Sequence, residues 1–368
     1  MTSPFRVAVI GCGVVGAAIA YELSLIPNLD VAVFDRNLPA QGATGAALGV
    51  MMAVISHKTK GRNWYLREIS LQRYETLIPE LAAATGQTVP YNRHGILSLV
   101  FDAEAWPKWQ RLQTIRQTQS YPLELWSVAQ VRDRFPELNL ARAYGAIYSP
   151  RDRQVEPISL SQALVTAAQQ QGAQLHLNHA VKAIAQSKQG QHGQAQIIQT
   201  DHGDFTADWV VVAAGLGTPT LTSALPMIPV LGQAMKIHCK PLMMSTEFQP
   251  VINGDDIHLV PLGNHQYWIG ATVEFPPQEN FADFAPLVPQ AKQLEALLQG
   301  AIAYCPALAQ GIVNQTWSGL RPRPQGQAAP VIQPLKTNPR MILATGHYRN
   351  GVLLAPATAL TVKSMITS

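Results

Sequence analysis

The first 35 residues constrain the fold of this chain more than any other stretch. An apolar run, Val7 to Ile10, leads into the sequence GCGVVG at positions 11–16, and a run of small residues follows. A second apolar run ends in Asp35, which lies 19 residues after Gly16. Dinucleotide-binding βαβ units place an acid at a spacing of about 20 residues. The order of strand, glycine turn, helix, strand and acid therefore predicts such a unit.

Each part of this unit has a physical role. Gly11 allows a tight turn, Gly13 lets the backbone approach a pyrophosphate, and Gly16 lets the helix pack closely on the strand. The helix N-terminus offers N–H groups to phosphates, and Asp35 can accept hydrogen bonds from ribose hydroxyls. The motif leaves NAD and FAD open, and a glycine-rich turn in another α/β protein is the alternative. The predicted contacts are Gly11, Gly13, Val14, Val15, Gly16, Asp35 and Arg36.

Composition narrows the class of protein further. The chain has 368 residues, of which 47% are hydrophobic and 14% charged, so a globular protein of two domains is expected. Its net charge is only +4 and its basic residues are scattered, which argues against a nucleic-acid groove. Neither the three cysteines nor the ten histidines show metal-ligand spacing, so no metal is expected. No signal peptide or membrane span is recognisable, which predicts a cytoplasmic protein without an integral membrane segment.

The pattern of strands and helices predicts an α/β fold with a discontinuous Rossmann-like domain. Its segments are expected at 1–90, 150–222 and 325–368. A second, α+β domain with a mainly antiparallel sheet is expected at 91–149 and 223–324. A helix should begin near Pro289, and the last helix should run from about Ala355 to Ile366. The small-residue run at 42–49 permits close approach to a ligand, the alternative being a flexible loop. Its predicted contacts are Thr44, Gly45 and Ala46.

The most specific sequence in the chain is GHYRNGVLLAP at 346–356. Here the chain resembles the glycine oxidases, which belong to the FAD-dependent D-amino acid oxidase family. The resemblance covers nearly the whole chain in order. Besides the N-terminal unit, it rests on VEP at 155–157, VVAAG at 211–215, PVLGQ at 229–233 and GLRP at 319–322.

The resemblance implies that FAD, bound non-covalently, is the dinucleotide. It implies that Arg321 grips the substrate carboxylate, with Arg349 and His258 nearby. His258 stands where these enzymes usually carry a tyrosine, and Gln333 replaces a glycine; both departures bear on the substrate more than on the cofactor. A structural Arg321, a solvent-facing His258 and a surface ion pair for Arg349 are the alternatives. The further cofactor residues implied are Val181, Ala214, Gly215, Gly346, Tyr348, Arg349, Asn350, Gly351, Val352 and Leu353.

The activity that the resemblance implies is oxidative deamination of glycine, sarcosine or small D-amino acids. Hydride transfer to the flavin needs no catalytic side chain, and dioxygen would be reduced to hydrogen peroxide. Thiamine biosynthesis is the implied pathway, and a homo-oligomer is expected. Two alternatives stay open: an amino acid dehydrogenase that passes electrons to a quinone or other carrier, and a non-catalytic FAD-binding subunit.

Overall fold

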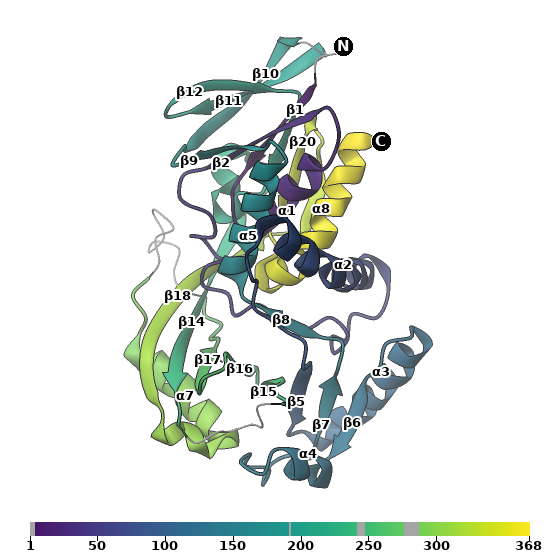
Figure 1. The fold of residues 1–368 in the computed structure, drawn as a ribbon, viewed down its shortest axis with the longest axis vertical. Helices are drawn as coiled ribbons and strands as arrows, with labels where there is room; N and C mark the ends of the chain where they lie inside the picture. Colours follow the sequence, from purple (N-terminus) through teal and green to yellow (C-terminus); the bar gives the residue numbers. More distant parts are fainter. Residues whose placement is uncertain (1–3, 191–192, 241–246, 276–286) are drawn as a thin grey trace.

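A six-stranded sheet forms the part of the molecule that contains the N-terminal glycine turn (Figure 1). The computed structural model describes residues 4–190, 193–240, 247–275 and 287–368. The strand order is β19-β20-β13-β1-β2-β9, and every neighbouring pair is parallel except β19 with β20. The strands are β1 (Phe5–Ile10), β2 (Leu29–Asp35), β9 (Gln174–Leu177), β13 (Trp209–Val212), β19 (Val331–Leu335) and β20 (Asn338–Thr345).

Residues 7–10 of β1 are continuously apolar because both faces of this sheet are covered. Val7 and Val9 belong to one buried cluster, which they share with four helices. Ala8 and Ile10 belong to another, formed with a β-meander. The helices are α1 (Val14–Ser24), α2 (Gly61–Thr85), α5 (Pro157–Gln170) and α8 (Gly351–Thr367), and the meander is β10 (Val181–Gly190), β11 (Gly193–Thr200) and β12 (Gly203–Ala207).

The second large sheet has eight strands in the order β18-β14-β17-β16-β15-β5-β7-β6. Only the β15–β5 pair is parallel, so this sheet is mainly antiparallel as predicted. Together with the first sheet it confirms the expected fold class. The strands are β5 (Ile96–Val100), β6 (Glu124–Ser127), β7 (Gly145–Ser149), β14 (Met227–His238), β15 (Val251–Gly254), β16 (Ile257–Pro261), β17 (Gln266–Gly270) and β18 (Ile312–Pro324).

The two faces of the second sheet have different partners. Helix α7 (Ala291–Tyr304) buries one face, where Leu297 and Tyr304 pack with Ile252 and Leu259. The opposite face meets the loop at 42–49, since Leu48 packs into a separate cluster with residues of β5, β14 and β16. That second face therefore looks toward the predicted cofactor loop.

Shorter elements connect the sheets and cover their ends. Figure 1 shows α3 and α4 beside β6 and β7, at the end away from the glycine turn. A three-stranded sheet in the order β3-β8-β4 lies between the two large sheets. These elements are β3 (Val50–Met51), β4 (Tyr91–Asn92), β8 (Arg153–Val155), α3 (Trp106–Thr118), α4 (Val128–Arg134) and α6 (Thr218–Leu221).

The last helix begins four residues earlier than predicted. The sequence suggested a start near Ala355. Helix α8 instead starts at Gly351 and runs through Pro356. Pro356 has no N–H for the carbonyl of Val352, and the hydroxyl of Tyr74 donates to that carbonyl at 2.6 Å. The predicted start near Pro289 for α7 is closer, since this helix begins at Ala291.

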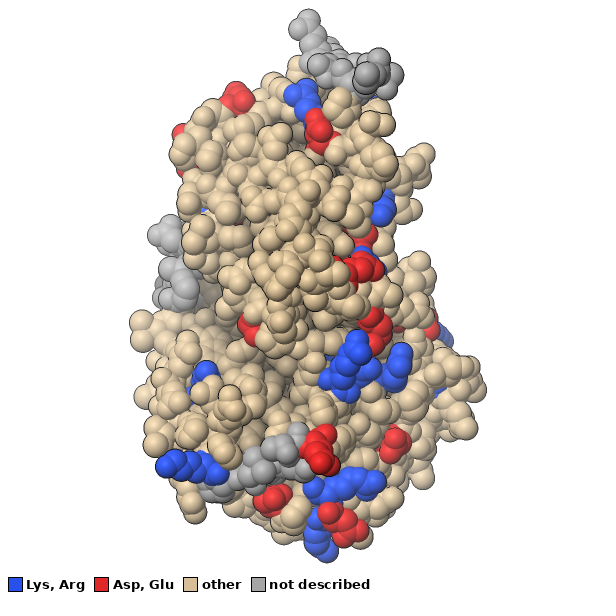
Figure 2. Space-filling model, in the orientation of Figure 1, with Lys and Arg blue, Asp and Glu red and all other residues tan. Residues whose placement is uncertain are grey.

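Two surface properties follow from the described residues. No described helix is both long enough and apolar enough to cross a lipid bilayer. On the face shown in Figure 2, acidic and basic side chains are scattered among uncharged ones. That scatter agrees with the low net charge of the sequence.

Candidate cofactor and substrate site

The predicted cofactor residues gather at the carboxyl edge of the first sheet. Strands β1, β2, β13 and β20 are parallel, so their C-terminal ends share one edge. Gly11 follows β1, Asp35 ends β2, Ala214 lies just beyond β13 and Gly346 follows β20. Ligands of open α/β sheets bind outside this edge. Val181 begins β10 soon after β9, whose C-terminal end shares the same edge.

The glycine turn is packed too tightly for any side chain. Gly11 has a φ of +105°, and a Cβ on it would lie 2.6 Å from the carbonyl oxygen of Ala213. A Cβ on Gly16 would lie 1.8 Å from the carbonyl oxygen of Gly11. These contacts hold α1 directly against the turn, so that its N-terminus opens at the carboxyl edge of the sheet. This cradle fits the pyrophosphate of a dinucleotide.

Thr44 joins the second predicted loop to this helix N-terminus. Its Oγ1 accepts a hydrogen bond from the Val14 N–H at 3.0 Å, and a Cβ on Gly13 would lie 3.0 Å from the same oxygen. The first bond within the helix runs from the Ala17 N–H to the Gly13 carbonyl. The N–H groups of Val15 and Gly16 precede that bond and point out of the N-terminus. Gly45 and Ala46 continue the loop, and the Ala46 carbonyl accepts from Trp317 Nε1 at 3.1 Å.

Asp35 is fixed by the backbone around it. Its two carboxylate oxygens accept from the N–H groups of Cys12, at 2.6 Å, and Asn37, at 2.8 Å. Burial raises the pKa of Asp35, while these two hydrogen bonds and the neighbouring charge of Arg36 oppose the rise. Each carboxylate oxygen has a further lone pair, which fits a ribose hydroxyl. Arg36 itself is exposed.

The GHYRNG segment forms a second helix N-terminus near the same edge. Gly346 has a φ of +67°, and a short 3-10 turn, Tyr348–Asn350, leads into α8. The Asn350 side chain does not cap the helix and instead accepts from Arg67 Nη2 at 3.4 Å. The N–H groups of the first turn, from Gly351 onward, therefore have no side-chain cap. An uncapped N-terminus suits the negative charge of a reduced flavin.

Arg321 lies on the face of β18 that looks toward the cofactor loop. Its Nη1 donates to the Leu231 carbonyl at 3.1 Å, and a Cβ on Gly232 would lie 2.2 Å from Nη2. The guanidinium therefore lies flat over Gly232. Burial, followed by the charge of Arg349, lowers the pKa of Arg321 to about 10, so the group stays charged at neutral pH. The GLRP sequence identified Arg321, but nothing local in the sequence identified Gly232 as its support.

The structure brings the three predicted substrate residues into one electrostatic site. Burial, the nearby Arg349 and the more weakly acting Arg321 lower the pKa of His258 to about 4. His258 Nδ1 is buried and makes no hydrogen bond to a described residue. None of the ion pairs among the described residues involves Arg321 or Arg349. Two nearby carboxylates, Asp256 and Glu274, oppose these pKa shifts but form no ion pair with either arginine, so both guanidinium groups are available to an anion.

Glycines leave parts of the sheet face between these groups without side chains. His258 pairs with Gly270, and Gly232 pairs with Gly319. A Cβ on Gly319 would lie 2.2 Å from Cβ of Ala46, and one on Gly270 would lie 3.0 Å from Leu48 Cδ1. These glycines let the cofactor loop approach the sheet closely. Sequence reasoning missed them because cross-strand register is not visible in a single strand.

Arg323 is a second residue that the sequence analysis left out of the site. It lies two positions after Arg321 on β18, and alternate residues of a strand share a face. Its guanidinium carbon lies 5.7 Å from the ring centroids of both Tyr348 and Phe275. The alternation of the strand was the signal that could have found it.

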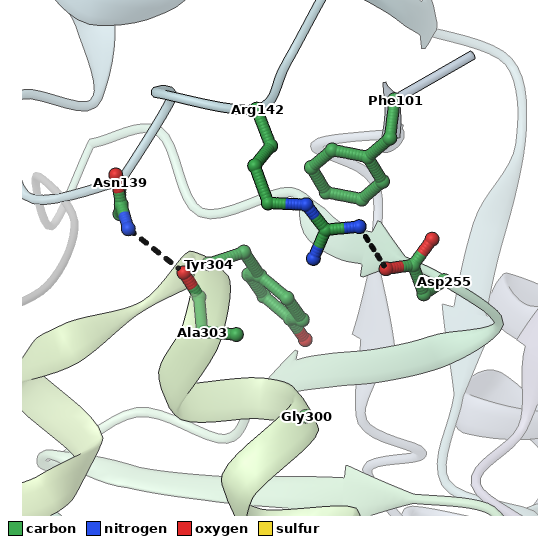
Figure 3. Close-up of a pocket in the computed structure, with 7 residues that line it drawn as sticks. All are labelled: Phe101, Asn139, Arg142, Asp255, Gly300, Ala303 and Tyr304. Carbon is green, nitrogen blue, oxygen red and sulfur yellow. Dashed lines mark hydrogen bonds and ion pairs between the residues drawn. The ribbon is translucent and has the colours of Figure 1, made fainter.

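A cavity elsewhere on the second sheet contains none of the predicted site residues (Figure 3). Its volume is about 20 Å³, room for roughly one water molecule. Arg142 and Asp255 face each other at 3.9 Å beside it, and Asn139 Nδ2 donates to the Ala303 carbonyl at 3.1 Å. A wider cleft of about 440 Å³ adjoins it, lined by polar, apolar and aromatic residues around the end of β5. Arg321 lies across the sheet, on edge strand β18.

A glycine-turn site at the carboxyl edge of a mostly parallel sheet defines a dinucleotide-binding protein. Residues 6–365 match the family described as FAD dependent oxidoreductase (DAO), and the chain belongs to that family. This membership confirms the family expected from the sequence and makes the chain an FAD-dependent oxidoreductase.

Curated relatives extend this family assignment. The chain is 35% identical to the bifunctional protein ThiO/ThiG of Synechocystis sp., over 100% of this chain and 52% of that protein. It therefore spans about half the length of that relative. It is 29% identical to the glycine oxidase of Geobacillus kaustophilus, over 100% of this chain and 94% of that protein.

Solved structures agree with the fold. The crystal structure of glycine oxidase from Geobacillus kaustophilus superposes with a TM-score of 0.87 and 28% identity, covering 99% of this chain and 95% of that one. L-proline dehydrogenase from P. horikoshii superposes with a TM-score of 0.85 at 20% identity, covering 100% and 94%. At that identity the second likeness shows the fold alone.

The first prediction concerns Asp35. Replacing Asp35 with Ala should weaken FAD binding about tenfold or more, because charged hydrogen bonds to the ribose and to the Cys12 N–H are lost. The measurement is FAD retained after gel filtration, read from the flavin absorbance, followed by a titration for Kd. Asp30→Ala is the control, since Asp30 is exposed at the start of the same strand. Equal retention in both variants would contradict the ribose role.

The second prediction concerns the charge of His258. Its pKa of about 4 lies below the ordinary value of 6.5, so the folded protein keeps this imidazole neutral as pH falls through 6.5. Binding of a carboxylate such as acetate to the holoenzyme should therefore show no His258 inflection between about pH 5.5 and 7.5. His258→Tyr should give a Kd–pH profile of the same shape. An inflection near 6.5 that only the wild type shows would mean that His258 titrates in the site.

Proposed function

We propose that this enzyme oxidises the C–N bond of a small amino acid or secondary amine. Glycine, sarcosine and small D-amino acids are the first candidates. The observation that carries the proposal is the half-buried guanidinium of Arg321, which lies over Gly232 without a carboxylate partner among the described residues. A planar guanidinium binds a carboxylate through two parallel hydrogen bonds, and it is charged at any working pH. The named glycine oxidase relatives support the same substrate class.

In this proposal the chain binds and orients the substrate. Arg321 holds the carboxylate, and Arg349 adds a second positive charge near it. His258, neutral in this site, is available for one hydrogen bond through Nδ1. Val273 and Phe275, which are 39% and 59% exposed, provide apolar surface near the arginines that a bound substrate can cover. Orientation and exclusion of water are the contributions expected from such a site.

The chemistry requires a cofactor, and the cradle described above fits FAD. When bound, FAD accepts the hydride that leaves the substrate α-carbon. As the C–H bond breaks, the nitrogen lone pair forms the C=N bond of an imine. Water then hydrolyses the imine to a 2-oxo acid and ammonia or an amine. Dioxygen, the proposed final acceptor, takes two electrons and two protons to give hydrogen peroxide.

Three finer points belong to the same proposal. The FAD is bound non-covalently, through the glycine turn, Asp35 and the start of α8. The chain divides into a discontinuous cofactor domain and a substrate domain, one around each large sheet. The product serves thiamine thiazole synthesis, as the resemblance implies. The first point is tested by denaturing the protein with acid, which releases only non-covalent flavin. The measurement is the amount of FAD that stays with the protein.

The proposal is tested by anaerobic reduction of the bound flavin. The purified holoenzyme is mixed with glycine, sarcosine, D-alanine and a panel of other amines, and bleaching of the flavin absorbance is recorded. Readmission of air then shows whether dioxygen reoxidises the flavin with formation of peroxide. Bleaching without rapid reoxidation would identify a dehydrogenase. A flavin that stays oxidised with every amine would overturn the proposal and favour a non-catalytic FAD-binding subunit.

A prediction for Arg321 follows from its role as the carboxylate clamp. Arg321→Ala should raise KM by about thirtyfold or more, because an unpaired buried charge costs about 2–5 kcal/mol. Gly232→Ala should have a similar effect, since its Cβ would occupy the space of the guanidinium. Arg111→Ala is the control, because Arg111 is exposed on α3. Steady-state kinetics with the best amine of the panel provide the measurement, and an unchanged KM in Arg321→Ala would remove this residue from the site.

A further inference from the structure

We propose that Arg323 forms a second anion subsite next to Arg321 and that the preferred substrates carry two carboxylates. The chemical class is an amine with one carboxylate on the carbon that is oxidised and another a few bonds away. This inference rests on the proposed function, because Arg321 takes the first carboxylate. It goes beyond that function by naming which small amino acids or amines fit best.

The strand register places the two arginines side by side. Arg321 pairs with Val230 and Arg323 with Ile228, in an unbroken run of β14–β18 pairs. Residues two apart on a strand point to the same face, with Cα atoms roughly 6.6 Å apart. Two carboxylates joined by a short carbon or nitrogen linker span a similar distance. The two side chains therefore leave the same face of β18 within the span of such a substrate, with the Arg321 guanidinium lying over Gly232.

Two aromatic rings hold the Arg323 guanidinium beside the site. Its central carbon lies 5.7 Å from the ring centroid of Tyr348 and 5.7 Å from that of Phe275. Tyr348 directly precedes Arg349 and is close enough to Arg321 to influence its pKa. Tyr348 is thus in contact with Arg323 and acts electrostatically on Arg321. Aromatic faces stabilise a guanidinium and leave its N–H edge available for a carboxylate.

The charge of the site exceeds what one carboxylate needs. Arg321, Arg323 and Arg349 form no ion pair with any carboxylate of the described residues. The acid nearest in effect is Glu274, whose Oε1 already accepts from Gln233 Nε2 at 2.9 Å and from the Thr272 hydroxyl. One carboxylate, such as that of glycine, satisfies one guanidinium bidentately. The second carboxylate of a dianion neutralises one of the two guanidinium charges that remain.

Arg323 is exposed, so non-specific attraction of anions must be distinguished from specific binding. A rim arginine can simply attract anions and raise association rates for all of them. Attraction of that kind acts on mono- and dicarboxylates in proportion to charge and fades with salt. A subsite still discriminates between a dicarboxylate and its monocarboxylate counterpart at high salt, where exposed charges are largely screened.

The experiment compares substrates that differ by one carboxylate. The pairs are iminodiacetate with sarcosine, and D-aspartate with D-alanine. The wild-type holoenzyme, Arg323→Gln and the control Arg111→Gln are assayed at low and at high salt. We expect Arg323→Gln to lower kcat/KM for the preferred dicarboxylate about tenfold and for its monocarboxylate partner less than twofold. Arg111→Gln should change neither. A loss of equal size for both members of each pair, or one that disappears at high salt, would overturn the subsite.

A binding measurement keeps this result independent of turnover. Succinate and propionate are titrated into the oxidised holoenzyme, and the shift in the flavin spectrum gives each Kd. We expect succinate to bind about tenfold more tightly than propionate in the wild type and equally in Arg323→Gln. Equal affinities in the wild type would overturn the inference even if amines are oxidised. Tight succinate binding that depends on Arg323, in a protein that oxidises no amine, would contradict only the proposed function.

Discussion

The architecture depends on one contact that glycine alone permits. The carbonyl oxygen of Gly11 lies where a Cβ of Gly16 would stand, at 1.8 Å, and Ala213 closes the other side of the turn. Helix α1 therefore rests on the ends of β1 and β13 without an intervening side chain. This contact aims the helix N-terminus at the carboxyl edge, and Thr44 then ties the cofactor loop to it through the Val14 N–H. The same loop reaches the second sheet through Ala46 and Trp317. A series of short contacts thus links the cofactor cradle to the substrate face.

The substrate face, unlike the cofactor cradle, carries arginine side chains that form no ion pair with a described residue. Arg321 is kept flat by Gly232 and the Leu231 carbonyl, and Arg349 lies close enough to lower its pKa. Two like charges in a half-buried site repel each other, and this repulsion lowers the free energy of unfolding. An anionic ligand relieves this repulsion, so the repulsion in the free protein favours binding of an anion. Burial and, after it, the same cations keep His258 neutral, because a third positive charge would lose its hydration and add to the repulsion. Charge at this site therefore comes from groups that do not titrate near neutral pH.

The sequence predicted what is local and missed what depends on pairing. The strand, turn and acid around Gly11 and Asp35 are contiguous, and both large sheets appear with the expected strand directions. The start of α8 was expected near Ala355, but the helix begins at Gly351 and continues through Pro356. The hydroxyl of Tyr74, which donates to the Val352 carbonyl that Pro356 leaves without a donor, lies 278 residues before Val352 in the chain. Gly232 and Gly319 appear in the sequence as parts of short motifs. Their structural role depends on the pairing of β14 with β18, which brings Gly232 beneath Arg321.

His258 shows why a substitution inside a site is hard to interpret from sequence. A histidine in place of a tyrosine suggested a charge that changes with pH, since free imidazole titrates near neutrality. The structure places it on β16, paired with Gly270, with Nδ1 buried and Arg349 and Arg321 nearby. Both the loss of hydration and the neighbouring cations oppose protonation. The residue therefore resembles tyrosine in the property that matters here: it is an uncharged ring with one polar atom available to a ligand. The substitution shortens the reach of that atom, which lies on the same sheet face as Arg321.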